Sequence, residues 1–310
     1  MQSRRDFLKK AGIGAGLLMA GAFPFESLAG EKEQKITILH TNDTHSRMEP
    51  FPVDGSKYEG QGGVAQRAAL IEKIRAEEEH VLLLDAGDIF QGTPYFNLYR
   101  GEPEIRALSM MRYDAVTMGN HDFDAGVEGF ARQLPHADFP VLVANYDFTQ
   151  TPLEHKTKPY TVITKGSIKI GIFGLGIQLK GLVPEESFGK TQYLEPIQVA
   201  RSISDRLRRR EKCDMVICLS HLGYEYDYAK VSDKILAKET DYIDLIIGGH
   251  THTFLDEPTV ITNRSGRSVV INQVGWAGLR LGRLDYSFGH KKNTNLSNAQ
   301  SVIIGKQTSG

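Results

Sequence analysis

Short apolar runs alternate with amphipathic stretches along most of this chain, and this alternation restricts the possible folds more than any other feature. The runs are rich in Val and Ile, as in buried strands, whereas the stretches between them carry apolar residues at helical spacing. The predicted strands are Lys35–Leu39, His80–Leu84, Ala115–Met118, Val141–Asn145, Ser167–Gly174, Met215–Leu219, Leu245–Ile247, Ser268–Gln273 and Arg280–Tyr286. The predicted helices are Gly63–Glu79, Glu104–Met111, Gly126–Leu134, Pro196–Lys212 and Tyr228–Glu239. This order indicates an α/β domain in which the last strands, where helices become fewer, pair as hairpins.

The length of the chain fits one large domain. It has 310 residues, of which 40% are apolar and 24% are charged, as in ordinary soluble globular proteins. No internal repeat or low-complexity linker divides it, so we expect a single folded domain at residues 30–288. Polar residues such as Lys291 and Asn295 predict that residues 289–310 form a tail of low order.

The first 29 residues have the features of an export signal. The segment from Ser3 to Lys9, Ser-Arg-Arg-Asp-Phe-Leu-Lys, resembles the twin-arginine consensus, and a Gly/Ala-rich apolar run follows at residues 11–25. Ser27-Leu28-Ala29 has the small-x-small pattern of a cleavage site. Because the apolar run is shorter than the ~20 residues that span a bilayer, we expect export by the twin-arginine route to the periplasm or cell exterior, without a stable membrane anchor.

Charge and cysteine content argue against two classes of site. The formal net charge of −1 lacks the basic excess of a nucleic-acid-binding protein, so no nucleic-acid partner is expected. The chain has two cysteines, Cys213 and Cys218, whose close spacing across a predicted helix-to-strand junction is unfavourable for a mutual disulfide. We expect both to be free thiols.

Five of the predicted strands are followed directly by a side chain that ligates hard or borderline metal ions. These side chains are, in chain order, Asp43 and His45, Asp88, Asn120, His221, and His250 and His252. Ligands bind beyond the carboxyl ends of strands in open α/β sheets, so we expect the side chains to converge there. Imidazoles, carboxylates and an amide oxygen, with no thiolate, suit Zn, Mn, Fe or similar ions.

The spacing within two of these sets has a simple interpretation. Asp43 and His45, like His250 and His252, are separated by one residue, so the members of each pair point the same way if the chain is still extended. Each pair is then able to grip one ion. Glycines at positions 87, 119, 248 and 249 permit sharp exits and close backbone approach.

Taken together, these motifs resemble the calcineurin-like metallophosphoesterase superfamily. The motifs are Asp43-x-His45, Gly87-Asp88, Gly119-Asn120-His121-Asp122, Ser220-His221 and Gly249-His250-Thr251-His252. More narrowly, three segments resemble the N-terminal catalytic domain of its bacterial 5′-nucleotidase, UDP-sugar hydrolase and 2′,3′-cyclic phosphodiesterase branch: His40-Thr41-Asn42-Asp43, Leu84–Asp88 with Phe90–Pro94, and Gly119–Asp124. The resemblance extends from about residue 35 to 288. It implies a single-domain sandwich of two packed sheets flanked by helices.

The resemblance also implies roles for individual residues. Asp43, His45 and His252 would hold one divalent metal ion, Asn120, His221 and His250 the second, and Asp88 would bridge both. His121, beside Asn120, would stabilise the transition state or protonate the leaving group, with Asp124 orienting its ring. A water activated by the metals would then attack phosphorus.

Other polar and aromatic residues have plainer interpretations. Isolated histidines are usually satisfied core or surface residues, and this is expected for His40, His80, His136, His155 and His290. Asp85 and Asp122 are expected to cap a turn or support a neighbour. Arg47 is able to reach a phosphate or to form an exposed salt bridge. Tyr95, Phe96 and Tyr99 are expected to be packing groups rather than base-stacking platforms.

Three functions are compatible with the sequence. The first is an exported phosphomonoesterase acting on nucleotides or related esters, and the second is a phosphodiesterase, nucleotide-sugar hydrolase or sulfur-ester hydrolase of the same superfamily. The third is a non-catalytic metal-binding subunit, which intact His121 and Asp124 argue against. Full-length members of the branch carry a C-terminal domain that grips base and sugar, and this chain ends before one. A broad phosphatase, or a separately encoded substrate-binding partner, is therefore expected.

Overall fold

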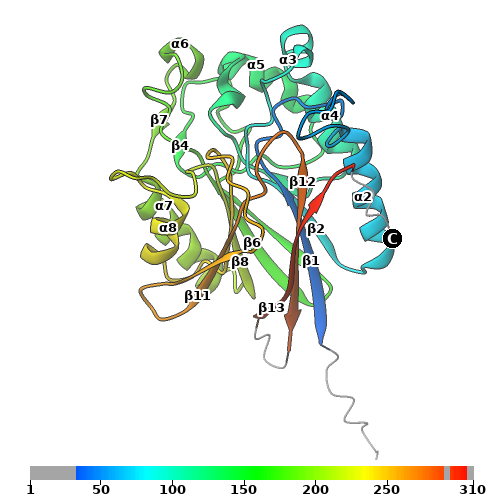
Figure 1. Ribbon diagram of the computed structural model, residues 1–310. Coiled ribbons are helices and arrows are strands. Elements are labelled where there is room, and N and C mark those ends of the chain that lie inside the picture. The colour runs from blue at the N-terminus through cyan, green and yellow to red at the C-terminus, as the bar shows by residue number, and fades with distance from the viewer. Residues whose placement is uncertain (1–32, 290–293, 306–310) are drawn as a thin grey trace, which may run out of the picture. The chain divides into compact units, whose positions relative to one another are not determined.

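Two β-sheets pack face to face, and helices cover the outer face of each (Figure 1). The computed structural model describes residues 33–289 and 294–305. The predicted export signal at residues 1–29 lies outside these residues. The expected sandwich of two sheets flanked by helices is confirmed.

The first sheet has five strands within the described residues and combines parallel and antiparallel pairs. Its strands, in order across the sheet, are β13 (Thr294–Ile303), β12 (Arg280–Phe288), β1 (Gln34–Thr41), β2 (Val81–Asp85) and β3 (Ala115–Val116). The central pair β1 and β2 is parallel, as is β2 with β3, whereas β12 runs antiparallel to both of its neighbours. The carboxyl ends of β1, β2 and β3 therefore share one edge.

The second sheet has six strands in the described part of the chain. In order they are β10 (Thr259–Thr262), β11 (Ser268–Asn272), β9 (Leu245–Gly248), β8 (Met215–Ser220), β6 (Ile168–Leu175) and β5 (Tyr160–Lys165). The four inner strands are parallel, and the hairpin partners β10 and β5 close the two edges in antiparallel pairing. A separate two-stranded ribbon joins β4 (Tyr146–Asp147) to β7 (Gln192–Tyr193).

Alternating side chains divide the apolar core into layers. Ile38 on β1 and Leu84 on β2 face the second sheet and pack with side chains such as Ile217 of β8. Their neighbours Leu39 and Leu83 point the other way, toward the helices. Successive strand residues face opposite sides, so both faces of β1 and β2 become apolar. Each such fully buried Ile or Leu contributes about 1.5–3 kcal/mol.

The helices pack onto the two outer faces. Figure 1 shows α2 beside the first sheet and α7 and α8 beside the second. The helices are α2 (Val64–Glu77), α3 (Pro94–Tyr99), α4 (Glu102–Met110), α5 (Gly126–Gln133), α6 (Glu185–Phe188), α7 (Pro196–Asp205) and α8 (Asp233–Glu239). No helix among the described residues has the length and apolar character needed to cross a bilayer.

Several predicted elements differ in extent from those observed. Val141–Asn145 is not a strand, because its pairing is limited to isolated bridges from Val141 and Leu142 to separate partners. The predicted helix at Tyr228–Glu239 begins only at Asp233, where the side chain turns inward to accept a hydrogen bond from Ser220. The helix predicted at Pro196–Lys212 changes from α to π geometry after Asp205.

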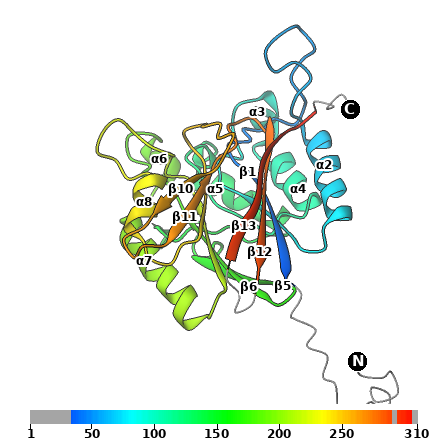
Figure 2. The same cartoon turned by 60° about the horizontal axis from the view of Figure 1, so that its bottom comes forward.

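The prediction of a low-order tail is wrong for residues 294–303. This segment forms β13, which pairs with β12 along its whole length at the sheet edge (Figure 2). Ser297 and Asn298 donate hydrogen bonds to Asp285 of β12, and Ile304 beyond the strand is buried. An edge strand that is partly exposed to solvent is held by backbone hydrogen bonds and tolerates polar side chains, so the polar composition of this segment did not indicate disorder.

Candidate active site

The predicted ligand side chains meet where the two sheets come together. Asp43 and His45 follow β1, Asp88 follows β2, and Asn120 follows β3, all in the first sheet. The others come from the second sheet: His221 follows β8, and His250 and His252 follow β9. All seven sit at carboxyl ends of parallel strands, but from two sheets instead of one.

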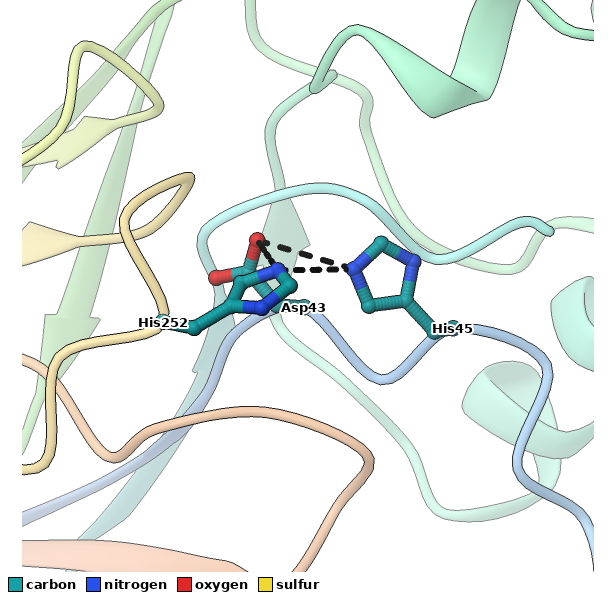
Figure 3. A group of neighbouring side chains, drawn as sticks. All are labelled: Asp43, His45 and His252. Atoms are coloured by element: carbon teal, nitrogen blue, oxygen red, sulfur yellow. Dashed lines mark hydrogen bonds and ion pairs between the residues drawn. The ribbon is translucent and has the colours of Figure 1, made fainter. Parts of the chain in front are cut away.

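Asp43, His45 and His252 form one compact group, with their side chains pointing toward one another (Figure 3). His252 Nε2 lies 3.3 Å from Asp43 Oδ1 and 3.0 Å from His45 Nε2. His45 Nε2 lies 4.0 Å from the same carboxylate oxygen. One carboxylate oxygen and two imidazole nitrogens around a common point match the ligand set of a divalent metal ion.

Asp88, His221 and His250 form the second group. His221 Nε2 lies 3.1 Å from Asp88 Oδ2, and the amide oxygen of Asn120 lies 2.8 Å from His250 Nδ1. Asn120 therefore belongs with this group. His250 and His252 fall into different groups. The expectation that two closely spaced residues share one ion therefore agrees with the geometry of Asp43 and His45 but not with that of the two histidines.

Asp88 lies between the groups. The oxygen that is 3.1 Å from His221 Nε2 is also 4.0 Å from His45 Nε2. Asp43 Oδ1 is in turn 3.9 Å from His221 Nε2. The two groups are thus immediate neighbours, and the position of Asp88 suits a carboxylate shared by two ions.

Backbone carbonyls orient two of the imidazoles for ligation. His221 Nδ1 lies 2.7 Å from the Ala86 carbonyl oxygen, and His45 Nδ1 lies 3.2 Å from that of Phe90. A carbonyl accepts only from N–H, which assigns the lone pair to Nε2 in each neutral ring. His221 Nε2 is buried, and the Asp88 carboxylate lies 3.1 Å from it. In the neutral ring, the Nε2 lone pair is directed into the site, as a metal ligand requires.

Burial and mutual attraction set the ionisation of these groups. Burial lowers the pKa of His250 to about 4, assisted by nearby His221, so this ring is neutral at pH 7 as ligation requires. Burial opposes charge on His221 and Asp88 as well. Their attraction overcomes it, raising the pKa of His221 to about 10 and lowering that of Asp88. Without a metal ion, protonated His221 thus balances the negative charge of Asp88, and a bound metal ion would take over this role.

His121 and Asp124 lie beside the two groups and form their own pair. His121 Nδ1 is 2.9 Å from Asp124 Oδ2, and the His121 ring packs edge-on against His45 at 5.3 Å between centroids. The hydrogen bond to Asp124 raises the pKa of His121 against the effect of partial burial. With Nδ1 held by the carboxylate, Nε2 is the nitrogen left to exchange a proton with a substrate.

Buried carboxylates and an amide support the ligand-bearing loops. Asp122 accepts hydrogen bonds from the backbone N–H groups of Asp88, Ile89, Phe90 and Gly119 at 2.8–3.1 Å. Asp85 accepts from Thr41 and from the N–H of Gly87. Asn42, which the sequence interpretation passed over, donates to Asp43 Oδ2 and accepts from the N–H of Val274. The supporting roles expected for Asp85 and Asp122 are observed.

The loops that carry the candidate ligands have an unusual backbone. Asp43, His45, Asp88, His250 and His252 all have positive φ, between 48° and 71°. Few non-glycine residues adopt this conformation, and clusters of them mark functional sites. It also corrects the expectation of an extended chain at Asp43 and His45, since β1 ends at Thr41. Close approach at Gly119 was expected correctly, because a Cβ there would collide with the Asp88 carboxylate.

A match to the Calcineurin-like phosphoesterase family covers residues 36–254. The chain belongs to this family. Calcineurin-like phosphoesterases are metal-dependent phosphate-ester hydrolases that use two divalent metal ions, and the two groups above are candidate sites for them. The resemblance inferred from the sequence is therefore confirmed.

Relatives of this phosphoesterase include several 5′-nucleotidases. The chain is 33% identical over 324 residues to the 5′-nucleotidase of Bos taurus, covering 97% of this chain and 53% of that protein. It is 33% identical over 297 residues to the snake venom 5′-nucleotidase of Crotalus adamanteus, covering 89% and 49%. The chain spans about half the length of the curated relatives it matches.

A solved structure gives the same result. The 5′-nucleotidase precursor from Thermus thermophilus aligns with a TM-score of 0.78 and 32% identity over 87% of this chain and 55% of that one. This chain thus resembles about half of that precursor in both sequence and fold.

Several residues outside the predicted ligand set of this phosphoesterase can be compared with what the sequence led us to expect. Phe96 is buried in the core, as expected of a packing group, whereas Tyr99 is exposed. Trp276, the chain's one tryptophan, stacks on His252 at 5.9 Å and 11°. The sequence interpretation missed it, although a single Trp among glycines is a signal that would have justified attention. His40 is buried and bonded to Asn272, and both cysteines are buried and free, as expected.

Proposed function

We propose that this protein is an exported, dinuclear-metal phosphoesterase that hydrolyses phosphate esters of nucleotides. The observation that carries the proposal is the pair of adjacent ligand groups with Asp88 between them and the His121–Asp124 pair beside them. A non-catalytic metal-binding subunit would need the groups but has no use for an oriented proton donor.

The donor set suits two ions. Asp43, His45 and His252 would hold one, and Asn120, His221 and His250 the other, with Asp88 shared between them. When bound there, two divalent ions would supply Lewis-acid activation of water and, against two carboxylates, an excess of positive charge that favours a phosphate dianion.

Residues of the chain itself complete the mechanism. His121 donates a proton to the leaving oxygen, and Asp124 holds the ring in position through Nδ1. Asp122 keeps Asp88 and the loop before Asn120 in register through four backbone hydrogen bonds. Fixed positions for the donor and the ligand loops lower the barrier because no reorganisation is needed during reaction.

The relatives support nucleotides as substrates and a location outside the cytoplasm. Relatives in Bos taurus and Crotalus adamanteus are named 5′-nucleotidases, the second from venom, and the Thermus structure is named a precursor. The twin-arginine pattern at residues 3–9 supports export to the periplasm. Fusing residues 1–35 to a reporter, with Arg4 and Arg5 intact or changed to Lys, tests this route, and equal export of both fusions would contradict it.

Metal removal tests the central proposal. Purified protein should bind about two divalent ions per chain and hydrolyse nucleoside monophosphates, and chelation should abolish turnover. Asp88→Ala should lose the most activity of any ligand variant because both ions share that carboxylate. Full activity in chelator, or no hydrolysis by protein with two bound ions, would contradict the proposal. A milder effect at Asp88 than at Asp43 would contradict the bridging role.

The proposal includes two alternatives for selection of the leaving group: a broad, weakly selective phosphatase, or a substrate-binding partner that sharpens the selection. Its test is the preference of the isolated protein for nucleoside monophosphates over an aryl phosphate. A ratio of kcat/KM below about tenfold is expected. A preference of several orders of magnitude by a monomeric protein would place the selectivity in this chain.

A further inference from the structure

A pocket of about 210 Å³ opens beside the group formed by Asp43, His45 and His252. His45, His121 and His252 line one part of it, and Arg47 and Trp276 line the rest. A phosphate ester bound at metal ions held by the two ligand groups would lie next to this pocket. Arg47 is the cationic side chain in its lining.

Packed rings fix the position of Arg47. Its Cζ lies 4.1 Å from the centroid of the Phe51 ring, within the range of a cation–π contact. Phe51 packs edge-on against Trp276 at 6.0 Å, and Trp276 stacks on His252. This chain of rings connects the guanidinium to a candidate metal ligand. Arg47 is therefore held at the pocket by packing and does not need an ion pair to place it.

The charge of Arg47 has no ion-pair partner among the described residues. Its Nε is buried without a hydrogen-bond acceptor, and across residues 33–289 and 294–305 no carboxylate forms an ion pair with it. The exposed salt bridge considered from the sequence is thus not observed. A partly buried cation without a counter-charge is costly, and an anionic ligand in the pocket would offset that cost.

A second, smaller cavity also has Arg47 in its lining. It has a volume of about 10 Å³, enough for one water molecule, and its lining also includes Glu104. Glu104 is buried, a hydrogen bond from Ser46 lowers its pKa against the larger effect of burial, and Arg67 lines the same cavity. Arg47 thus borders both this cavity and the pocket of about 210 Å³ beside His45 and His252.

We propose that Arg47 binds the phosphoryl group of the substrate at this pocket. A guanidinium presents paired N–H donors that match phosphate oxygens, and these bonds are stronger when both partners are charged. The inference rests on the proposed phosphoesterase function and adds to it a phosphate-binding side chain that is not a metal ligand. It makes substrate affinity, and not metal affinity, depend on Arg47.

The test is phosphate binding and steady-state kinetics of metal-loaded Arg47→Gln. Inorganic phosphate is the probe, measured both by calorimetry and as a competitive inhibitor. The Kd and Ki for phosphate and the KM for a phosphate monoester should rise ~10- to 100-fold, while metal content stays unchanged. Arg47→Lys should recover part of the affinity, because it keeps the charge but loses the planar fork.

Arg210→Gln is the matched control. Arg210 is exposed and precedes β8, at the end of that strand remote from His221. Its loss removes the same charge and should change phosphate affinity less than ~2-fold. Equal weakening by both variants, or an unchanged Kd and Ki in Arg47→Gln, would overturn the proposal. If Arg47→Gln does not fold, Phe51→Leu should still weaken phosphate binding severalfold, and normal binding in that variant would overturn it.

Calorimetry also separates the two hypotheses. If the wild-type protein binds phosphate but hydrolyses no ester, the proposed function fails while the binding role of Arg47 is still measured. If hydrolysis is normal and Arg47→Gln binds phosphate normally, the inference fails and the proposed function stands.

Discussion

Replacing Asp122 with Ala should destabilise the protein and release its metals together. The Asp122 carboxylate is fully buried and accepts four backbone hydrogen bonds. Three of the donors belong to residues 88–90, which follow β2, and the fourth belongs to Gly119, which follows β3. One side chain therefore ties the loop of Asp88 to the loop of Asn120.

The expected loss of stability arises because the four backbone N–H groups have no acceptor after the substitution. Each buried N–H left without an acceptor costs about 1–3 kcal/mol. Removal of a buried carboxylate offsets part of this, since burial and the nearby Asp88 raise the pKa of Asp122 to about 7 and show that its charge is unfavourable there. Relaxation of the surrounding loops, and water that enters the space left by the side chain, offset a further part of this cost. We expect a net loss of roughly 3–6 kcal/mol, a large share of the 5–15 kcal/mol typical of a folded domain.

The assay is urea unfolding of metal-free protein at about pH 8, above the pKa of about 7 for Asp122, with metal content measured separately. Asp138→Ala is the control, because Asp138 is exposed and follows the turn after α5. It should change stability by less than about 0.5 kcal/mol. A loss below ~1 kcal/mol in Asp122→Ala, or full metal content with normal stability, would refute the reasoning.

Two further predictions separate catalysis from ligation and test the last strand. His121→Ala should retain both metals but slow turnover roughly 10²–10⁴-fold, as measured by metal analysis and kcat, and loss of a metal would make His121 a ligand instead. Asp285→Asn should destabilise the protein by about 1–3 kcal/mol at pH 7, because Asp285 accepts hydrogen bonds from Thr37, Arg283 and Asn298. Burial opposes this charge, but the donors lower the pKa of Asp285 overall, so its stabilisation is present above the unfolded pKa near 4 and is lost as pH falls through the lower folded value. Urea unfolding should show the difference between wild type and variant shrinking below about pH 4, and a constant difference would contradict the assignment.

The fold class was predictable because apolar patterning reports burial directly. Runs such as Met215–Leu219 and Leu245–Ile247 are apolar throughout, as strands buried on both faces must be, and both are strands in the structure. β13 was not predictable in this way. β12 forms backbone hydrogen bonds with β13 whatever side chains β13 carries, so the composition of β13 does not reveal that it is a strand.

The candidate site shows the same division. Residue type and position after a strand were enough to select all seven ligand candidates, and the family resemblance added the His121–Asp124 pair. The way these residues assemble was not available from spacing. His250 and His252 separate into different groups, and Asp43 and His45 meet through positive φ angles in place of an extended chain.

What the sequence determined by itself is the chemistry: carboxylate, imidazole and amide groups at strand ends, with the order of motifs that identifies the family. Only the tertiary structure decided that two sheets share the site, that Asp88 lies between the ligand groups, and that Arg47 faces a pocket bordered by Trp276. The chemical groups of a side chain follow from its residue type, so they are known from the sequence alone. Placement depends on contacts between segments such as residues 47–51 and 252–276, which are far apart in the chain and are brought together only when the core packs.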